Sequence, residues 1–267
     1  VSFLFAFLML MLQIIFGYLR QIEGVIAARY IALIITIFFS VKLIIKNVNI
    51  TNPNITTVSS NEKVEIVKFG FICMLSNVSS AIMQSNQKRI ISDFFKDAEI
   101  LADYQVASYI IQIVTFALNA LIIFLMPYFV SHREDREWCY RIYNRIMKFN
   151  FGLMLIFHLV LFIFSKEFLC LVFGQQYASA ATLMRMIVIA SFGQSALRIL
   201  PGNILPLLGY EKYNVAVNVI VVGIHLIAAN VFIRYWGING AALAMAAVYY
   251  ISGIMYMIKV RKELHKI

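Results

Sequence analysis

ASAATLMRMIVIASFGQSALRILPGNILPLLG, residues 178–209, is long and apolar enough to cross a bilayer, and the rest of the chain is interpreted around it. It also carries Arg185 and Arg198, so hydrocarbon cannot be its only neighbour. At about 100° per residue, Gln194 and Arg198 share one helical face, whereas Arg185 lies well round the helix. Pro201 removes a backbone donor, which predicts a kink or break near Arg198. Broken helices in membranes usually line a cavity, so this segment predicts a cavity wall.

The composition places the chain among membrane proteins with several spans. Of its 267 residues, 62% are hydrophobic and 13% are charged, a balance that does not fit a soluble globular protein. The net charge of +10 comes from lysines and arginines at the ends of apolar runs, which indicates membrane orientation and argues against nucleic acid as a partner. The three cysteines form no CxxC motif and no Cys/His pair at ligand spacing, so we expect no metal site and no cofactor.

The apolar runs predict an all-α polytopic membrane protein with eight transmembrane helices. The runs cover residues 1–19, 25–45, 64–91, 104–130, 149–164, 178–209, 213–233 and 237–258. A polar, turn-forming sequence, NVNITNPNITTVSSNEK at residues 47–63, separates the first two runs from the other six. It predicts a linker between a domain at residues 1–46 and a domain at residues 64–267.

A basic segment, HREDREWCYRIYNRIMK at residues 132–148, precedes the fifth run. Its apolar and cationic side chains fall on different helical faces, so we expect a separate helix at the membrane interface. If the linker is cytoplasmic, the side that also holds this helix and the C-terminus carries twice as many lysines and arginines as the other side. This bias predicts a cytoplasmic linker and a cytoplasmic C-terminus.

Three stretches carry a resemblance to a known family. They are KRIISDFFKDAEILADYQVASYIIQIV at 88–114, LPGNILPLLGYEKYN at 200–214 and WGINGAALAMAAVYY at 236–250. In this order they resemble the polysaccharide or O-antigen lipid-linked oligosaccharide flippases (Wzx-like) of the multidrug/oligosaccharidyl-lipid/polysaccharide exporter superfamily. Members of that family have two six-helix lobes that face each other across a central cavity. The resemblance implies that residues 64–267 form a six-helix C-terminal lobe and residues 1–46 the last two helices of an incomplete N-terminal lobe.

The resemblance also implies a function, which is transport and not catalysis. The expected substrate is an undecaprenyl-diphosphate-linked oligosaccharide repeat unit, moved from the cytoplasmic to the periplasmic leaflet for O-antigen or capsular polysaccharide assembly. The expected location is the cell inner (plasma) membrane, and the expected partners are membrane lipids, polysaccharide polymerase and assembly proteins. The residues fit this expectation, because the span interiors hold arginine but no aspartate or glutamate, and a diphosphate needs cations to leave water.

The candidate substrate-binding residues are basic or amide positions in or beside the spans. They are Arg198, Arg185, Gln194, Asn77, Gln84, Lys88 and Arg89. The basic residues either contact the diphosphate or lie at the membrane interface as anchors. The amides either bind sugar hydroxyls along a cavity wall or make hydrogen bonds between helices. We expect Arg198 to be the first contact for phosphate, and we expect no catalytic residue.

Three other functions stay open from the sequence. A multidrug exporter of the same superfamily would need acidic residues in its cavity to attract cations, and the arginines argue against it. A membrane-embedded polysaccharide polymerase or acyltransferase would need a general base or a nucleophile pair, and the histidines form no HxxxxD or HExxH motif. An inactive, truncated flippase is the third alternative.

His158 and His225 lie inside predicted spans. They serve either in proton coupling or as hydrogen-bonded structural residues.

Overall fold

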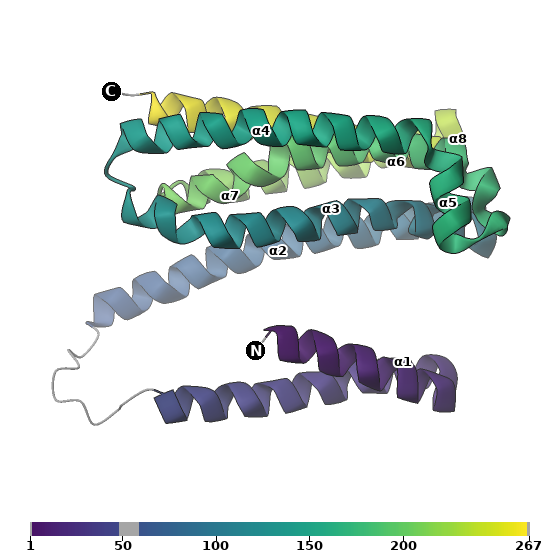
Figure 1. The fold of residues 1–267 in the computed structure, drawn as a ribbon, viewed down its shortest axis with the longest axis horizontal. Helices are drawn as coiled ribbons and strands as arrows, with labels where there is room; N and C mark the ends of the chain where they lie inside the picture. Colours follow the sequence, from purple (N-terminus) through teal and green to yellow (C-terminus); the bar gives the residue numbers. More distant parts are fainter. Residues whose placement is uncertain (1, 48–58, 266–267) are drawn as a thin grey trace. The chain divides into compact units, whose positions relative to one another are not determined.

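The protein is built from helices throughout the part that the structure describes (Figure 1). The computed structural model describes residues 2–47 and 59–265. In chain order the helices are α1 (Ser2–Asn47), α2 (Ser60–Phe95), α3 (Ala98–Ser131), α4 (Arg136–Ile163), α5 (Ser165–Phe173), the 3₁₀ helix η1 (Gln175–Ala180), α6 (Ala181–Phe192), the π turn η2 (Gly193–Arg198), α7 (Ile199–Leu207) and α8 (Glu211–Leu264). This confirms the predicted all-α fold class.

Five stretches among the described residues are long and apolar enough to cross a membrane. They are Phe7–Leu43, Ala98–Ser131, Arg136–Ile163, Gln175–Leu207 and Glu211–Leu264. Large apolar side chains stand exposed along them, as expected for helices that meet lipid instead of water; Ile227, for example, is 70% exposed. The fold is therefore that of a polytopic membrane protein, as predicted, while the count of eight spans stays a prediction.

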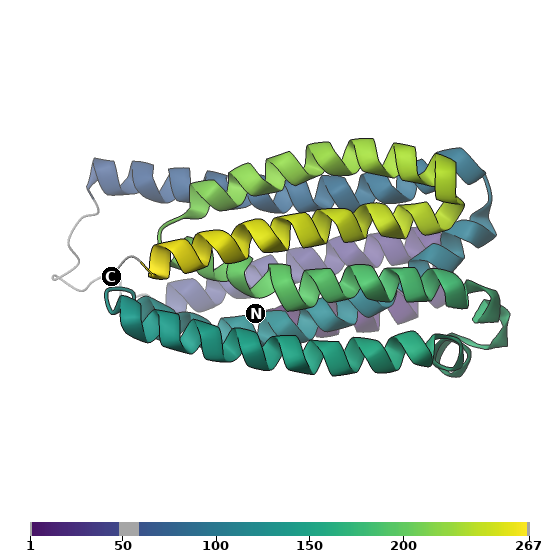
Figure 2. The ribbon, with the colours of Figure 1, turned by 90° about the horizontal axis from the view of Figure 1, so that it is seen from above.

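Two of these stretches contain a break in the helical backbone. In α1 the helical geometry is lost at Arg20 and Gln21, and in α8 it is lost at Gly237. Gly237 has a φ of +58°, a conformation that glycine adopts at little cost because it lacks a Cβ atom. Figure 2 shows the arm of α8 before this break and the arm after it running side by side. The break in α1 falls between two apolar runs of the sequence, and the break in α8 coincides with the start of the run at residues 237–258.

The chain divides into two compact units, residues 1–63 and 64–267. In the first unit the two arms of α1 meet closely, since a Cβ atom on Gly24 would lie 1.9 Å from the Phe16 carbonyl oxygen. Ala28 and Ala32, one and two turns further along, are fully buried. Most of the predicted linker lies outside the described residues, so the predicted assignment of the domains stays a prediction.

The prediction of a separate interfacial helix at residues 132–148 is wrong. α4 continues without interruption from Arg136 to Ile163, so the basic segment and the apolar run after it form one helix. A single buried stripe passes through both parts and consists of Cys139, Tyr143, Met147, Asn150, Met154, His158 and Leu161. No proline interrupts this stretch of sequence. The change in composition within α4 therefore does not mark the end of a helix.

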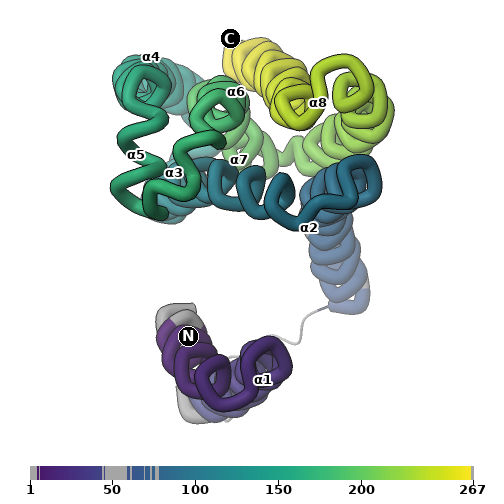
Figure 3. Tube along the Cα trace, turned by 90° about the vertical axis from the view of Figure 1, so that its right-hand side faces the viewer, coloured from purple at the N-terminus to yellow at the C-terminus, as the bar shows by residue number. Residues whose placement is uncertain are grey.

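The irregular segment Gln175–Leu207, which combines 3₁₀, α and π geometry, lies at the centre of the second unit. Of its apolar stretch 67% is buried, against 22–33% for the other candidate spans. Seen end-on, α6 lies between α3, α4 and α8 (Figure 3). Glycines allow α8 to come close, because a Cβ on Gly253 would lie 2.7 Å from Leu197 Cβ, and one on Gly193 would lie 2.7 Å from the Tyr250 ring. α8 therefore packs directly against the π turn.

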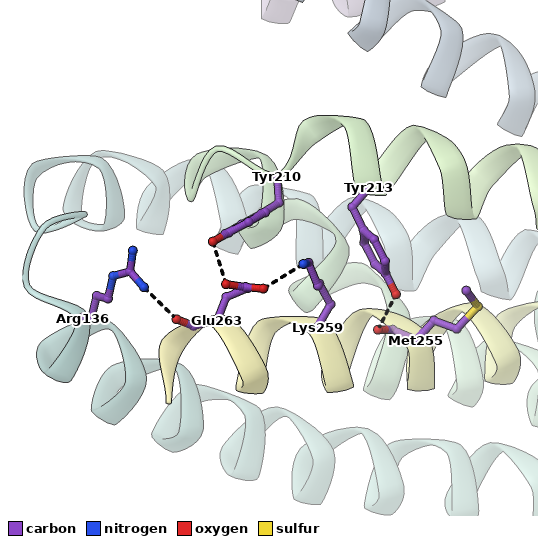
Figure 4. A network of polar contacts seen from close by, with 6 residues as sticks. All are labelled: Arg136, Tyr210, Tyr213, Met255, Lys259 and Glu263. Carbon is purple, nitrogen blue, oxygen red and sulfur yellow. Dashed lines mark hydrogen bonds and ion pairs between the residues drawn. The ribbon is translucent and has the colours of Figure 1, made fainter. Parts of the chain in front are cut away.

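A polar network ties the end of α8 to its neighbours (Figure 4). Glu263 is only 5% exposed and accepts hydrogen bonds from Lys259 Nζ at 2.8 Å and from the Tyr210 hydroxyl at 2.7 Å. Arg136 Nη1 donates to the backbone oxygen of Glu263 at 3.2 Å. The Lys259 ammonium also lies 4.7 Å from the centre of the Tyr210 ring. The start of α4, the loop before α8 and the end of α8 are thereby joined.

Candidate functional site

The helix that carries Arg198 changes its hydrogen-bond pattern midway. α6 gives way at Gly193 to the π turn η2, which passes into α7 at Ile199. There the Ile199 amide donates to the carbonyl of Gln194, five residues back instead of four. Pro201 has no amide hydrogen, so a regular α pattern could not continue through this segment. The predicted irregularity near Arg198 is thus confirmed and takes the form of a π turn.

Two adjoining cavities, each of about 300 Å³, form a groove in the second unit. We call one the arginine pocket; its wall includes Ser80, Arg198, Asn203, Asn214, Asn218 and Tyr256. We call the other the amide pocket; its wall includes Gln87, Lys88, Gln105, Ser108, Gln112 and Phe116. Both pockets are also lined by Gln84, Thr115, Asn119, Gln194 and Tyr249. The groove therefore lies between α2, α3, α8 and the region of the π turn.

Uncharged neighbours hold Arg198 in place. Its Nη2 donates to Asn218 Oδ1 at 2.9 Å, and its guanidinium carbon lies 5.5 Å from the centre of the Tyr249 ring. The Tyr256 hydroxyl donates to the same Asn218 oxygen at 3.0 Å, and the Asn218 amide donates to Asn214 Oδ1 at 2.9 Å. Arg198 Nε is buried and has no hydrogen-bond partner in the described structure. The guanidinium is thus held in position, and its Nε donor has no partner among the described residues.

The charge in the groove is positive. No aspartate or glutamate is among the residues that line either pocket. The ion pairs found among the described residues join Arg89 to Asp93 and Lys259 to Glu263, so neither supplies Arg198 with a carboxylate. Lys88, on the wall of the amide pocket, adds a second cation. A guanidinium presents its donors in a fork that matches phosphate oxygens, so the groove suits an anionic ligand.

Four of the predicted site residues come together in this groove. They are Arg198, Gln194, Gln84 and Lys88. Gln194 belongs to both pockets: its Nε2 donates to Thr115 Oγ1 at 3.2 Å, while its Oε1 is buried without a partner among the described residues. Their convergence is a finding of the structure, and their contact with a substrate stays a prediction.

The other three predicted residues are not brought to the groove. Arg185 Nε donates to the backbone oxygen of Phe162, near the end of α4, at 3.3 Å. Arg89 is exposed and pairs with Asp93 at 3.5 Å. These positions favour the alternative interpretation, in which both arginines are anchors at the membrane surface. Asn77 belongs to α2, but its side chain lies outside the described part of the structure.

Sequence reasoning missed the polar face of α3. The side chains that line the groove from α3 include Gln105, Ser108, Gln112, Thr115 and Asn119. They follow one another at intervals of three and four residues, which places them on one helical face. This spacing was a signal available in the sequence. The meeting of Asn214 and Asn218 with Arg198 depends on the fold and had no such local signal.

The buried histidines are engaged in hydrogen bonds between helices and within them. His158 places Nδ1 2.8 Å from the Met154 carbonyl oxygen and Nε2 3.0 Å from Ser191 Oγ. His225 places Nε2 2.6 Å from Gln87 Oε1. Both histidines are buried. Of the two interpretations of these residues, the geometry favours the structural one over proton coupling.

Comparison with known proteins gives the same class of fold. Residues 2–182 match the family described as "Polysaccharide biosynthesis protein". Among solved structures, the chain is similar to the outward-facing conformation of a multidrug resistance MATE family transporter of the MOP superfamily, with 15% identity and a TM-score of 0.77. It is also similar to the Vibrio cholerae MATE transporter VcmN in the bent form, with 16% identity and a TM-score of 0.71.

The match covers unequal shares of the compared chains. In both structural comparisons 98% of this chain is covered, but 61% of the other chain, so this chain spans about three fifths of the length of those transporters. At this level of identity the likeness shows a shared fold. No curated protein sequence matches the chain.

Proposed function

We propose that this chain, which belongs to the polysaccharide biosynthesis protein family, is part of a transporter that carries lipid-linked oligosaccharides across a membrane. The cargo would be an undecaprenyl-diphosphate-linked repeat unit, moved from the cytoplasmic to the periplasmic leaflet for O-antigen or capsular polysaccharide assembly. The family match and the MATE-like fold support a transporter of the MOP superfamily. They also argue against an enzyme, since the relatives of this fold are transporters.

One observation carries the choice of cargo: Arg198 lies in a groove that is lined by no carboxylate among the residues that the structure describes. A diphosphate leaves water only when cations and hydrogen-bond donors replace its hydration shell. Arg198 supplies a fixed positive charge and the unpartnered donor Nε, and Lys88 supplies a second positive charge in the adjoining pocket. The arrangement therefore supports an anionic headgroup better than a cationic one.

A drug exporter is the second candidate, because one of the similar structures is a multidrug resistance transporter. Export of cationic drugs would favour acidic residues in the groove, and the described pockets are lined by none. The cytoplasmic C-terminus belongs to this proposal as well and rests on the charge bias of the flanking residues. The inner membrane location also belongs to the proposal, and it follows from the family resemblance. Contacts with polysaccharide polymerase and assembly proteins are likewise proposed.

Complementation tests this function. The complete gene is expressed in a strain that lacks its own flippase, with wild type, Arg198→Ala, Arg198→Lys and Arg185→Ala compared at equal protein level. Arg185 is the matched control, because it is an arginine of the same helical segment that does not line the groove.

We expect wild type and Arg185→Ala to restore surface polysaccharide. Arg198→Ala should lower it at least tenfold, because hydrogen bonds to a charged group contribute about 1.5–3 kcal/mol, and Arg198→Lys should keep part of it. Equal polysaccharide with Arg198→Ala and wild type would remove Arg198 from the site. Drug resistance without any polysaccharide would favour the exporter.

A further inference from the structure

We infer that the amide pocket binds the sugars of the cargo while the arginine pocket binds its diphosphate. The inference rests on the proposed function. It assigns a sugar-binding subsite to the same groove and gives the orientation of the cargo within it. It is carried by the side chain of Gln194, which stands where the two pockets meet.

The orientation of the Gln194 amide follows from its neighbour. Thr115 donates its only hydroxyl proton to the Ile111 carbonyl oxygen at 2.6 Å. Thr115 Oγ1 can therefore only accept from Gln194, so the nitrogen of Gln194 faces Thr115 and the oxygen faces away. That oxygen, Oε1, is buried and meets no donor among the residues that the structure describes. A buried amide oxygen in a native protein ordinarily has one, so a donor from outside the chain is expected here.

The missing donor identifies the class of ligand. The oxygens of an ionised phosphate diester only accept hydrogen bonds, so they cannot pair with Gln194 Oε1. A sugar hydroxyl can donate to it, and so can the N–H of an acetamido sugar. Arg198 shows the opposite requirement, because a guanidinium only donates and suits phosphate. Gln194 and Arg198 lie one helical turn apart, and Gln194 needs a hydrogen-bond donor where Arg198 needs an acceptor. They therefore suit two chemically different parts of one ligand.

The polar face of α3 extends the sugar-binding chemistry along the groove. Asn119 comes fourteen positions after Gln105, which is about 21 Å along a helix at 1.5 Å per residue. No hydrogen bond among the described residues engages the side-chain amides of Gln105 and Gln112, which leaves their donors and acceptors to a ligand. Phe116, 78% exposed on the same pocket wall, offers an apolar ring to the C–H face of a sugar.

Gln87 belongs to the wall of this pocket and not to its ligand-reading groups. Its Nε2 donates to the Ala241 carbonyl oxygen at 2.8 Å, and its Oε1 lies 2.6 Å from His225 Nε2. Both ends of its amide are therefore occupied, and the side chain is 1% exposed. The contrast with Gln194 and Gln112 separates amides that hold the helices together from amides that stay open to a ligand.

The order of the pockets gives the cargo a direction. On α2 the arginine pocket takes Ser80 and the amide pocket takes Lys88, two turns nearer the connection to α3. On α3 the amide pocket is again the one nearer the connection to α2, because Gln105, close to the start of α3, lines the amide pocket and not the arginine pocket. The sugars therefore lie toward the α2–α3 connection and the diphosphate lies away from it. In the proposed topology that connection faces the periplasm, where the sugars are delivered.

The test uses two flippase-deficient strains whose lipid-linked repeat units differ in the sugars next to the diphosphate. The complete gene is expressed in each as wild type, Gln194→Met, Gln112→Met or Arg198→Ala, and surface polysaccharide is measured at equal protein level. Gln112 is exposed, so Gln112→Met keeps the test valid if Gln194→Met fails to accumulate. Asn230→Leu is the control, because the side-chain amide of Asn230 is exposed and donates to the Leu226 carbonyl oxygen of its own helix.

We expect the two methionine variants to change the ratio of the two polysaccharides by about tenfold, because they remove hydrogen bonds that depend on the sugar. Arg198→Ala should lower both polysaccharides to the same extent, because both cargoes carry the diphosphate, and Asn230→Leu should change neither. An unchanged ratio in both methionine variants, whether or not the total falls, would overturn the sugar assignment alone. Full activity of Arg198→Ala would overturn the proposed function itself.

Discussion

Replacement of Asn150 by leucine should loosen the π turn that carries Gln194 and Arg198. Asn150, on α4, is 2% exposed, and its Nδ2 donates to the backbone oxygen of Ser195 at 3.0 Å. In a regular α-helix that oxygen would accept from the amide of Ile199, but this amide donates to Gln194 instead. Asn150 therefore supplies a hydrogen-bond donor that the π turn has moved away from Ser195.

The size of the effect follows from what Asn150→Leu leaves behind. Leucine is close to asparagine in size but cannot donate, so the Ser195 oxygen stays buried without this partner. An unsatisfied buried group costs about 1–3 kcal/mol, whereas hydrogen bonds between membrane helices average about 0.6 kcal/mol. We expect the free energy of unfolding to fall by about 1–2 kcal/mol, which lies between these two values. Because the same turn positions Arg198, transport should fall as well.

The assay is unfolding of the purified full-length protein in mixed micelles of increasing sodium dodecyl sulfate content, followed by the loss of tertiary structure. Asn230→Leu is the control, since that exposed amide bonds within its own helix and should change the unfolding free energy by less than about 0.5 kcal/mol. Wild-type stability together with wild-type transport in Asn150→Leu would refute the claim that Asn150 supports the π turn.

Three further changes test the packing around the groove and the surface. Gly253→Val places a side chain where a Cβ would already lie 2.7 Å from Leu197 Cβ, so it should separate α8 from the π turn, lower stability by about 1–3 kcal/mol and lower transport, measured by the same unfolding and complementation assays. Glu263→Ala removes the acceptor for the Tyr210 hydroxyl, so limited proteolysis should cut the loop before α8 faster than in wild type. An unchanged rate of cleavage would show that the network does not hold this loop in place. Arg89→Ala breaks only an exposed ion pair, so thermal unfolding and transport should both match wild type, and a clear loss of transport would return Arg89 to the site.

Local signals in the sequence were sufficient for the fold class and for the irregular helix. Long apolar runs predict spanning helices wherever they occur, and Pro201 cannot continue an α pattern whatever surrounds it. The break at Gly237 also coincides with the start of a predicted run. These features depend on residues near one another in the chain, so the sequence alone carries them.

Other features depend on contacts between helices or on where a helix lies. Two hydrogen bonds join different helices: Arg198 donates to Asn218, and Asn150 donates to Ser195. The local spacing of these residues in the sequence does not predict either bond. The sequence predicts two elements in α4 because its start is basic and its end is apolar, whereas the structure has one continuous helix. Depth in the membrane changes the composition of a helix without ending it.

On the proposed function, Arg198 gives the groove its affinity for a lipid diphosphate. Binding of undecaprenyl diphosphate to the purified full-length protein measures this contribution when wild type, Arg198→Ala and Arg185→Ala are compared at the same ionic strength. We expect Arg198→Ala to weaken binding about tenfold or more and Arg185→Ala to bind as wild type does. Equal affinity of wild type and Arg198→Ala would show that Arg198 does not bind the diphosphate.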